Sequence, residues 1–332
     1  MTQPVQHGYL LGIDTGSSKT HAIISDLAGN VLGFGEAGSG NYEVVGLPGL
    51  KSALSHAVNL AKEQAGIINE EIVSMGLGLA GYDWPSEEPL MIEAIEALSL
   101  DVKYQFVNDV VLGLIAGSTH GWGIAVDAGT GNNVRGLDER GKMGRITGNG
   151  IRFGEIGGAS ELVWKAMVAV TYSWSQRGPK TGLTEYFMDY VGVPSEETLI
   201  EALAMEEAYL PSDLARGIFS LAEMGDLIAH QIITESATEL ARNTNAVIRQ
   251  LNMQNKDFEV VLIGSVFNAG DIYLSPFKET VLKFAPKAKF LKLSVPPVVG
   301  GVLLAAKTIG LSADDLRDNL IQSTLALISK NQ

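Results

Sequence analysis

Two short loops of the chain each join a carboxylate to small residues, a combination suited to holding a polyphosphate. The first starts at Asp14, where an apolar run ends, and continues as Thr15-Gly16-Ser17-Ser18-Lys19-Thr20. Turns of Gly, Ser and Thr expose backbone N–H groups and hydroxyls, the donors that a phosphate requires. The spacing of a Walker loop is absent. Alone, the segment is as compatible with a hairpin turn that carries a capping aspartate as it is with a phosphate loop.

The second loop repeats this pattern further along the chain. It reads Asp127-Ala128-Gly129-Thr130-Gly131-Asn132-Asn133 and again follows a strand-like run. One such loop is weak evidence, because hairpin turns have similar compositions. Two loops at matched positions can hold a polyphosphate from both sides, so the functional interpretation of the pair is the stronger one.

A third carboxylate, Asp109, follows a strand-like run and begins a predicted helix. Asn108 or Asp109 is well suited to cap that helix, and the local pattern favours this interpretation. The functional alternative is a general base at the end of a strand, where it takes a proton from an attacking hydroxyl.

Four glycine-rich segments are further candidates for ligand contact, in a chain with 38 glycines. Gly264-Ser265-Val266 ends another apolar run, and it is either a strand-to-helix turn or a surface for adenine and ribose. Three more segments are equally compatible with plain turns and with the walls of a cleft: Gly38–Tyr42, Gly78–Asp83 and Gly148–Glu155.

Strands and helices that position these loops are also predicted by the residue pattern. Runs at Tyr9–Ile13, His21–Ser25 and Val31–Glu36 predict a three-stranded meander. Helical spacing of apolar residues predicts a helix over Leu47–Ala65. Strands and helices then alternate over Ile72–Leu79, Glu87–Leu98, Lys103–Val107 and Asp109–Ala116.

The second half of the chain repeats this order. Strands are predicted at Gly123–Val126, Asn133–Leu137 and Met143–Ile146, followed by a helical insertion over residues 157–250. Alternating strands and helices follow at Glu259–Ile263, Pro276–Phe284, Lys289–Leu293 and Val298–Ile309. A β-β-β-α-β-α-β-α order that occurs twice indicates an internal duplication. We therefore predict an α/β protein whose halves face each other across a cleft, with one domain at 1–117 plus 310–332 and the other at 118–309.

Composition narrows the class of protein. The 332 residues carry 24 Lys and Arg against 38 Asp and Glu, a net charge of −14. So acidic a chain has no electrostatic footprint for nucleic acid or for an anionic membrane. The absence of cysteine excludes disulfides, thiol catalysis and Cys-ligated zinc or iron–sulfur clusters. Because we find no targeting signal and no apolar span of ~20 residues, we expect a soluble cytoplasmic protein.

The order of these motifs resembles that of the actin, heat-shock chaperone and sugar kinase superfamily. In that superfamily the corresponding motifs are called phosphate 1, connect 1, phosphate 2, adenosine and connect 2, and they imply duplicated actin-like, ribonuclease H-like domains. From Leu11 to Ile309 the chain is most similar to the BadF/BadG/BcrA/BcrD ATPase family, in its branch of N-acetylglucosamine and glucosamine kinases. The similarity is carried by GLAGYDWPSEE at Gly78–Glu88, GSVF at Gly264–Phe267 and PPVVGG at Pro296–Gly301.

The resemblance implies ATP and Mg²⁺ as cofactors and assigns residue roles. Asp109 is the expected catalytic base, and Asp14 and Asp127 would hold magnesium through water. Phosphate contacts are expected from Asp14, Gly16, Ser17, Ser18, Lys19, Thr20, Gly129, Thr130 and Gly131, and adenosine contacts from Ala222, Gly264, Ser265 and Ala269. The sugar pocket is expected to contain Asn41, Tyr42, Asn108, Asn132, Asn133, Gly148, Asn149, Gly150 and Glu155.

Two segments depart from the family pattern. The family usually has Gly-Gly-Gly-Thr where this chain has Thr15-Gly16-Ser17-Ser18, although serine retains the hydroxyl. It usually has Gly-Asp-Glu-Gly-Ser where this chain has Gly154-Glu155-Ile156-Gly157-Gly158, so one acidic residue is lost and the sugar specificity is open. Without cysteine, the branch that activates dehydratases through a Cys-held cluster is excluded.

The leading hypothesis is an ATP-dependent kinase that phosphorylates a hydroxyl of an amino sugar such as N-acetylglucosamine or glucosamine. A nucleotide-driven conformational switch that acts on a protein partner is the main alternative, and a non-catalytic sugar-sensing regulator is a third. The expected partner is a small-molecule sugar, and a homodimer is compatible with the resemblance. Which sugar and which hydroxyl react stays open.

Overall fold

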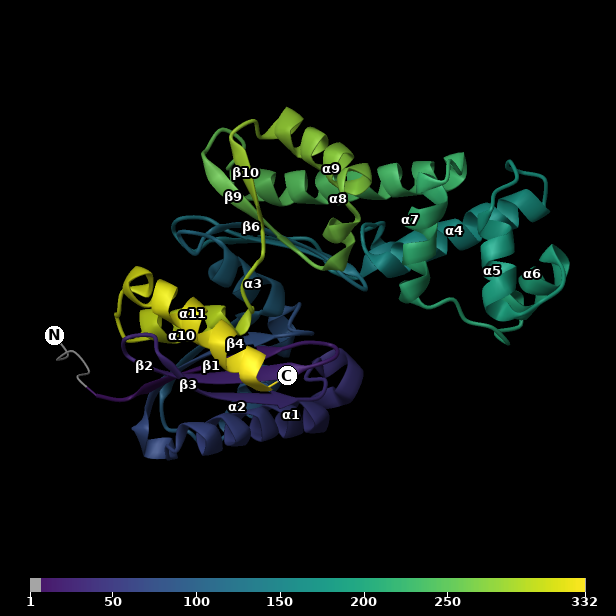
Figure 1. Ribbon diagram of the computed structural model, residues 1–332. Helices are drawn as coiled ribbons and strands as arrows, with labels where there is room; N and C mark the ends of the chain where they lie inside the picture. The colour runs from purple at the N-terminus through teal and green to yellow at the C-terminus, as the bar shows by residue number, and fades with distance from the viewer. Residues whose placement is uncertain (1–6, 332) are drawn as a thin grey trace.

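The main chain forms two five-stranded mixed sheets in the computed structural model, which describes residues 7–331 (Figure 1). The first sheet has the strand order β3-β2-β1-β4-β5. The first three strands form an antiparallel meander, and β4 and β5 run parallel to β1. Their bounds are β1 (Tyr9–Thr15), β2 (Thr20–Asp26), β3 (Val31–Ala37), β4 (Ile72–Leu79) and β5 (Lys103–Asn108).

The second sheet repeats the topology of the first. Its order is β10-β9-β6-β7-β8, so β6 takes the place of β1 and β9 the place of β4. The meander is again antiparallel, and β9 and β10 are again parallel to the central strand. This confirms the predicted duplication. The bounds are β6 (Gly123–Ala128), β7 (Asn132–Leu137), β8 (Met143–Arg145), β9 (Phe258–Ile263) and β10 (Ala288–Lys292).

Helices cover both sheets and build the insertion between β8 and β9. The first half contains α1 (Tyr42–Ala65), α2 (Glu88–Glu96) and α3 (Asp109–Gly117). The insertion contains α4 (Ala159–Trp174), α5 (Leu183–Val191), α6 (Glu196–Ala204), α7 (Ala215–Glu223) and α8 (Leu227–Gln250). The chain continues with α9 (Asp271–Phe284), α10 (Val298–Thr308) and α11 (Ala313–Asn331).

Helix α1 follows the predicted apolar spacing and is interrupted at Gly46, whose φ is +64°, so its continuous part begins at Leu47 as predicted. Its buried face includes Leu50, Leu54 and Val58, which pack on the first sheet. A short helical turn begins at Tyr42, before this break, and the side chain of Asn41 caps it by accepting a hydrogen bond from the amide of Glu43 at 2.9 Å.

The last helix of each half packs across onto the sheet of the other half. Helix α10 lies against β1 and β4, although we had placed residues 298–309 in the second domain, and this packing corrects that boundary. The close approach of α10 to β4 requires glycine, because a Cβ on Gly76 would lie 2.1 Å from the carbonyl oxygen of Gly301. Conversely, helix α3 of the first half packs on the second sheet through Val110 and Leu114.

Helix α11 was not predicted from the sequence. It packs against α10 and β3 through the buried side chains of Leu316 and Leu320. Arg317 donates hydrogen bonds to the carbonyl oxygens of Ala116 at 2.8 Å and Ile115 at 3.1 Å. These carbonyls lie in the last turn of α3, where backbone acceptors lack helical partners and a cation is favourable.

The insertion extends away from the first sheet, with α5 and α6 at its far end (Figure 1). The helices α4, α7 and α8 pack on one another and share a hydrophobic core with the second sheet. Among residues 7–331, no helix is long and apolar enough to cross a membrane.

Candidate active site

Three aspartates come from three different elements, and the charge of one of them, Asp109, raises the pKa of the other two. Asp14 lies near the end of β1, Asp109 starts α3 and Asp127 lies near the end of β6. Burial, together with the negative charge of Asp109, raises the pKa of Asp14 well above its usual value. Burial raises the pKa of Asp109 to about 6, and burial with repulsion from Asp109 and Glu161 raises the pKa of Asp127 to about 8. The cluster therefore favours bound protons or a cation.

The start of α3 reconciles the two interpretations of Asn108-Asp109. Asn108 is the N-cap, because its side-chain oxygen accepts from the amide of Val110 at 3.0 Å. Asp109 is the first helical residue, and its carboxylate also accepts from Val110 at 3.0 Å. With Asn108 in the capping role, Asp109 remains available on the wall of the neighbouring cavity.

A central cavity of about 400 Å³ opens between the two halves beside Asp109. It brings together residues from both phosphate-type loops and from three of the four glycine-rich segments, those at Gly38–Tyr42, Gly78–Asp83 and Gly148–Glu155. The expected site residues that line it are Ser17, Asn41, Asn108, Asp109, Asp127, Gly131, Asn132, Asn133, Gly148, Asn149 and Gly150.

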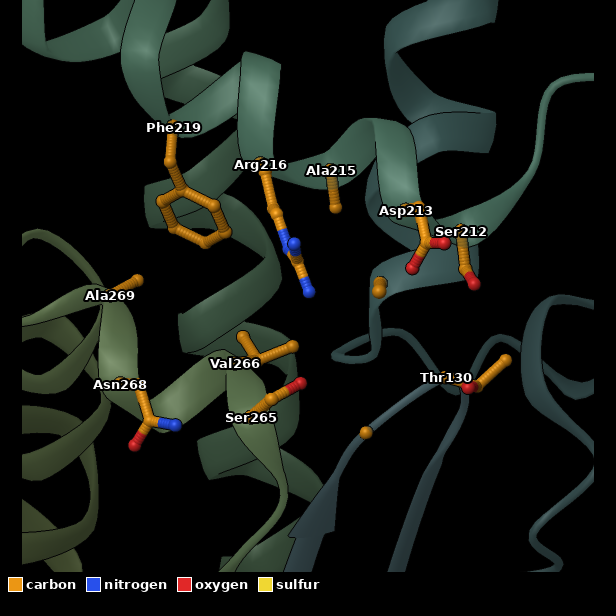
Figure 2. A pocket seen from close by; sticks show the side chains of 12 residues that line it. Thr130, Ser212, Asp213, Ala215, Arg216, Phe219, Ser265, Val266, Asn268 and Ala269 are labelled. Carbon is orange, nitrogen blue, oxygen red and sulfur yellow. The ribbon is translucent and has the colours of Figure 1, made fainter. Parts of the chain in front are cut away.

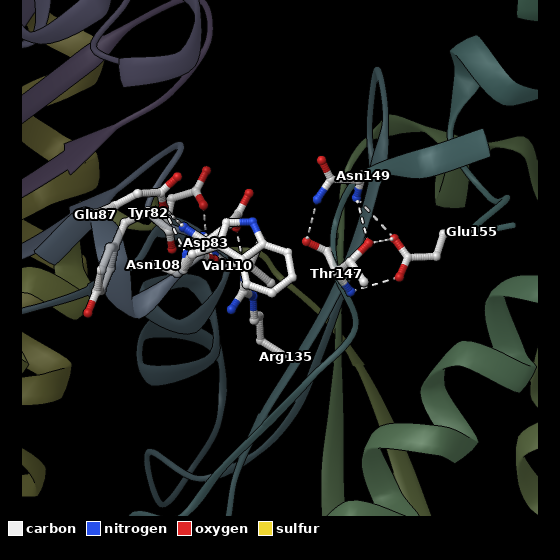
Figure 3. A network of polar contacts seen from close by, with 11 residues as sticks. Tyr82, Asp83, Glu87, Asn108, Val110, Arg135, Thr147, Asn149 and Glu155 are labelled. Atoms are coloured by element: carbon white, nitrogen blue, oxygen red, sulfur yellow. Dashed lines mark hydrogen bonds and ion pairs between the residues drawn. The ribbon is translucent and has the colours of Figure 1, made fainter. Parts of the chain in front are cut away.

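Two expected sugar contacts do not line the central cavity. Tyr42 packs against the hydrophobic core of the first half. The carboxylate of Glu155 accepts from the amide of Thr147 at 2.7 Å, from its hydroxyl at 2.9 Å and from the amide of Asn149 at 3.0 Å (Figure 3). Glu155 thus holds the loop that presents Asn149 to the cavity.

A lateral cavity of about 370 Å³ lies between the second sheet and the helical insertion (Figure 2). Four of the residues expected to contact nucleotide line it: Gly129, Thr130, Ser265 and Ala269. It meets the central cavity along one loop, because Gly129 and Thr130 line the lateral cavity while Gly131 lines the central one.

Two residues that we expected to contact adenosine, Ala222 and Gly264, do not line the lateral cavity. Ala222 is buried in the core of the insertion. Gly264 lies where a Cβ would come 2.3 Å from the carbonyl oxygen of Ala128, and its φ is +97°, so glycine is needed for the approach of β9 to β6. Arg216 of α7, which we had not predicted, extends into the cavity instead (Figure 2).

The first loop is closed by its own backbone, with the amide of Gly16 donating to the carbonyl of Lys19 at 2.8 Å. Ser17 is the member of this loop that reaches the central cavity, and its hydroxyl accepts from the Asn41 side chain at 3.0 Å. Lys19 instead pairs with Glu36 at 3.1 Å, and the Thr20 hydroxyl donates to the carbonyl of Gly38 at 2.9 Å. The other residues of this loop that we expected to contact phosphate line neither cavity: Asp14, Gly16, Ser18, Lys19 and Thr20.

An ion pair that we did not predict from the sequence joins the two halves next to Asp109. Asp83, in the loop after β4, pairs with Arg135 of β7, and both side chains are buried (Figure 3). The Asn108 side chain donates to Asp83 at 3.2 Å, so the helix cap and the ion pair form one network. No local motif marks Arg135, although a charged residue in an apolar strand was a usable signal.

A second missed carboxylate, Glu161, lies at the base of the central cavity. It belongs to the first turn of α4 and accepts from the amide of Gly158 at 2.7 Å and from the Asn132 side chain at 3.2 Å. Burial raises its pKa. We did not predict Glu161 as a site residue, because it lies outside the motif segment Gly154–Gly158, in which an acidic residue of the family pattern is lost.

The donor set fits a hydrated magnesium ion. Mg²⁺ usually retains several waters and binds one or two carboxylates together with substrate phosphates. Asp14 and Asp127 provide two carboxyl groups near Asp109, and their raised pKa values favour a nearby cation; residues 7–331 contain no group of three or more Asp, Glu, His or Cys side chains placed to hold a metal directly.

The model of the BadF/BadG/BcrA/BcrD ATPase family matches residues 11–305. The chain belongs to this family. The match includes nearly all of both sheets, both phosphate-type loops, helix α3 and most of α10. Membership in this ATPase family agrees with the two loops that flank Asp109 and the lateral cavity.

Two curated relatives have similar length. An N-acetylmuramic acid/N-acetylglucosamine kinase of Clostridium acetobutylicum is 29% identical over 299 residues, which cover 90% of this chain and 98% of the relative. An N-acetyl-D-glucosamine kinase of Dictyostelium discoideum is 27% identical over 314 residues, covering 89% and 97%. A solved structure from Chromobacterium violaceum, described as a candidate N-acetylglucosamine kinase, superposes with a TM-score of 0.68 at 21% identity and covers 90% of this chain and 99% of its own; it shows the shared fold.

Proposed function

We propose that this member of the family is an ATP-dependent kinase that phosphorylates a hydroxyl of an amino sugar. The observation that carries the proposal is the position of Asp109, between the two phosphate-type loops and on the wall of a cavity rich in asparagine. The names of the two curated relatives agree with this assignment. Nucleotide would occupy the lateral cavity, with its phosphates directed along Gly129–Gly131 toward the sugar.

Asp109 acts as the general base. The sugar oxygen attacks the terminal phosphorus of ATP, the bond from that phosphorus to the bridging oxygen breaks, ADP leaves, and the hydroxyl proton passes to the Asp109 carboxylate. Because its pKa is about 6, Asp109 is largely ionised at neutral pH yet remains a stronger base than an ordinary aspartate. Asn108, bound to the helix start and to Asp83, fixes the position of the base.

Asp14 and Asp127 are the residues we assign to magnesium, each through water. When bound, Mg²⁺ neutralises charge on the phosphates of the nucleotide. Backbone amides of the two loops and the Thr130 hydroxyl would contact the phosphates. Arg216 reaches into the lateral cavity and would contact the nucleotide by charge or by stacking.

A reaction that consumes ATP leads us to propose a cytoplasmic location as well. The domains we propose are the two duplicated halves, with α10 assigned to the sheet that it covers.

A coupled ADP-release assay with Mg·ATP and a panel of hexoses and hexosamines tests the proposed function. We expect strong stimulation by at least one amino sugar and phosphate transfer to that sugar, detected by mass spectrometry. Slow hydrolysis that no sugar changes would overturn the kinase assignment and favour the nucleotide-driven switch.

A further inference from the structure

Acidic side chains gather on the wall of the central cavity. Five carboxylates line it, those of Glu43, Asp83, Asp109, Asp127 and Glu161, and no Lys, Arg or His is among the residues that form its wall within the described chain. Asp83 is paired with Arg135, which does not itself line the cavity, and Asp127 belongs to the proposed magnesium pair. Among the described residues, Glu43, Asp109 and Glu161 have no cationic partner, and burial raises the pKa of all three, so this wall favours a cation over an anion.

Glu161 presents one oxygen toward this cavity. The hydrogen bonds from Gly158 and Asn132 are both accepted by Oε2, and the backbone amides of Gly157 and Glu161 also act on this carboxylate and lower its pKa. The other oxygen, Oε1, lies close to two glycines of the cavity wall: a Cβ on Gly150 would be 3.2 Å from it, and one on Gly131 would be 3.9 Å away. Because neither position carries a side chain, Oε1 stays uncovered. Yet Glu161 is only 6% exposed, which makes an unpaired charge there costly.

Asn132 adds a second acceptor with no partner. Its side-chain nitrogen donates to Glu161 and to the carbonyl oxygen of Glu155 at 3.3 Å, which fixes the orientation of the amide. Its side-chain oxygen is buried without a hydrogen-bond partner, in a residue that is 5% exposed and lines the cavity. A buried acceptor of this kind requires a donor, which a ligand can supply.

We propose that Glu161 Oε1 and Asn132 Oδ1 bind the free ammonium group of an unacetylated amino sugar, and that Glu161 determines the specificity of the enzyme. The inference rests on the proposed sugar kinase function and names its substrate class. An ammonium group supplies three donors and a positive charge, which match two acceptors and an unneutralised carboxylate. An acetylated nitrogen is uncharged, has one donor and adds a carbonyl acceptor.

The same acidic wall disfavours a sugar that carries a carboxylate. A lactyl acid substituent, such as that of N-acetylmuramic acid, would enter a cavity with no cation on its wall and would meet Glu43, Asp109 and Glu161. Like charges at close range are repelled strongly where water is excluded. This chain is therefore expected to differ in substrate from the Clostridium acetobutylicum relative, whose name includes that acid sugar.

The first experiment compares kcat/KM for glucosamine, N-acetylglucosamine, glucose and N-acetylmuramic acid with saturating Mg·ATP, at a pH below the pKa of the amine. A charge-assisted hydrogen bond is worth about 1.5–3 kcal/mol, so we expect glucosamine to exceed glucose and N-acetylglucosamine by about ten- to hundredfold, with N-acetylmuramic acid last. Preference for N-acetylglucosamine or for N-acetylmuramic acid overturns the inference and leaves the kinase function standing. Turnover of no sugar overturns the proposed function itself.

Variants then test the role of Glu161. Glu161→Gln keeps the shape and removes the charge; it should raise the KM for glucosamine at least tenfold and change the KM for glucose much less. Glu161→Asp keeps the charge and should retain the preference for glucosamine over glucose at a higher KM. Glu201→Gln, an exposed change on α6, is the matched control. An equal loss for glucosamine and glucose in Glu161→Gln, with unchanged thermal unfolding and nucleotide binding, overturns the assigned role.

Discussion

The carboxylate of Asp83 pairs with the guanidinium of Arg135 across the boundary between the two halves. Asp83 follows β4 of the first sheet and Arg135 belongs to β7 of the second. The pair lies beside the proposed base: the negative charge of Asp83 raises the pKa of Asp109, and the positive charge of Arg135 lowers it. One contact thus joins the halves and sets the electrostatic environment of Asp109.

Opposite pH shifts are expected when the two partners are changed singly. Arg135→Gln removes a nearby positive charge and should move the acid limb of the kcat/KM profile to higher pH, while Asp83→Asn should move it to lower pH. The measurement is the pH dependence of kcat/KM for each variant and the wild type. Shifts in the same direction for both variants would mean that the pair acts on Asp109 only through structure.

Stability should respond differently to these substitutions. Because Arg135 is 2% exposed, Arg135→Gln leaves Asp83 as a buried carboxylate with no cation, a change that typically costs about 3–5 kcal/mol. The double variant with Asp83→Asn removes both charges and should recover much of this loss. Chemical denaturation of the three variants measures it; a double variant no more stable than Arg135→Gln alone would contradict the account.

Replacement of the proposed base should separate chemistry from binding. Asp109→Asn keeps the size of the side chain but cannot accept the hydroxyl proton, so kcat should fall about 10²–10⁴-fold. Nucleotide binding in the lateral cavity should remain, because Asp109 does not line it. Single-turnover kinetics and calorimetric titration with a non-hydrolysable nucleotide test both parts. Near-normal turnover in this variant would exclude Asp109 as the base.

The wild-type pH profile follows from the same group. With a pKa of about 6, Asp109 loses its negative charge as the pH falls through that value, so kcat/KM should drop about tenfold per pH unit on the acid side. An acid limb close to pH 4, the value of an ordinary aspartate, would show that burial does not shift the base in the active enzyme.

Stability of the nucleotide-free protein should decrease as pH rises from acid to neutral. Asp109 and Asp127 have pKa values of about 6 and 8 in the folded chain, above the usual 3.8, so the folded state binds more protons than the unfolded state between these values. Their stabilising contribution is complete below the usual pKa and is lost as pH rises through the folded pKa.

Asp127→Asn gives the matched comparison for this effect. It removes one titrating group, so unfolding temperatures should decrease less between about pH 5 and pH 8 than in the wild type. Added Mg²⁺ should stabilise the wild type at the higher pH and have less effect on the variant. Identical pH slopes in the two proteins would contradict the raised pKa of Asp127.

Packing of α10 on the first sheet should be sensitive to a single methyl group. A Cβ on Gly76 would lie 2.1 Å from the backbone oxygen of Gly301, so Gly76→Ala must displace the helix and should cost about 1–3 kcal/mol. Gly38→Ala is the control, because a Cβ there meets no atom within 4 Å. Comparable unfolding temperatures for the two variants would show that the crossing helix adapts without cost.

Most of the fold was predictable because its signals are local. The duplicated strand order, the long helix and the loops after β1 and β6 follow from hydrophobic periodicity and from glycine placement, which depend on neighbouring residues. We did not predict helix α11, because it has few apolar positions. Leu316 and Leu320 are buried because α11 packs against α10 and β3.

The sequence by itself determined the pair of carboxylate-bearing loops, the strand-end Asp109 and the absence of cysteine chemistry, since each depends on residue type and position along the chain. Only the tertiary structure decided that Arg135 meets Asp83, that Glu161 enters the central cavity, and that Tyr42 and Glu155 stay off its wall. Those relationships join residues as far apart as Asp83 and Arg135, and they depend on how two sheets and their crossing helices pack, which no local pattern encodes.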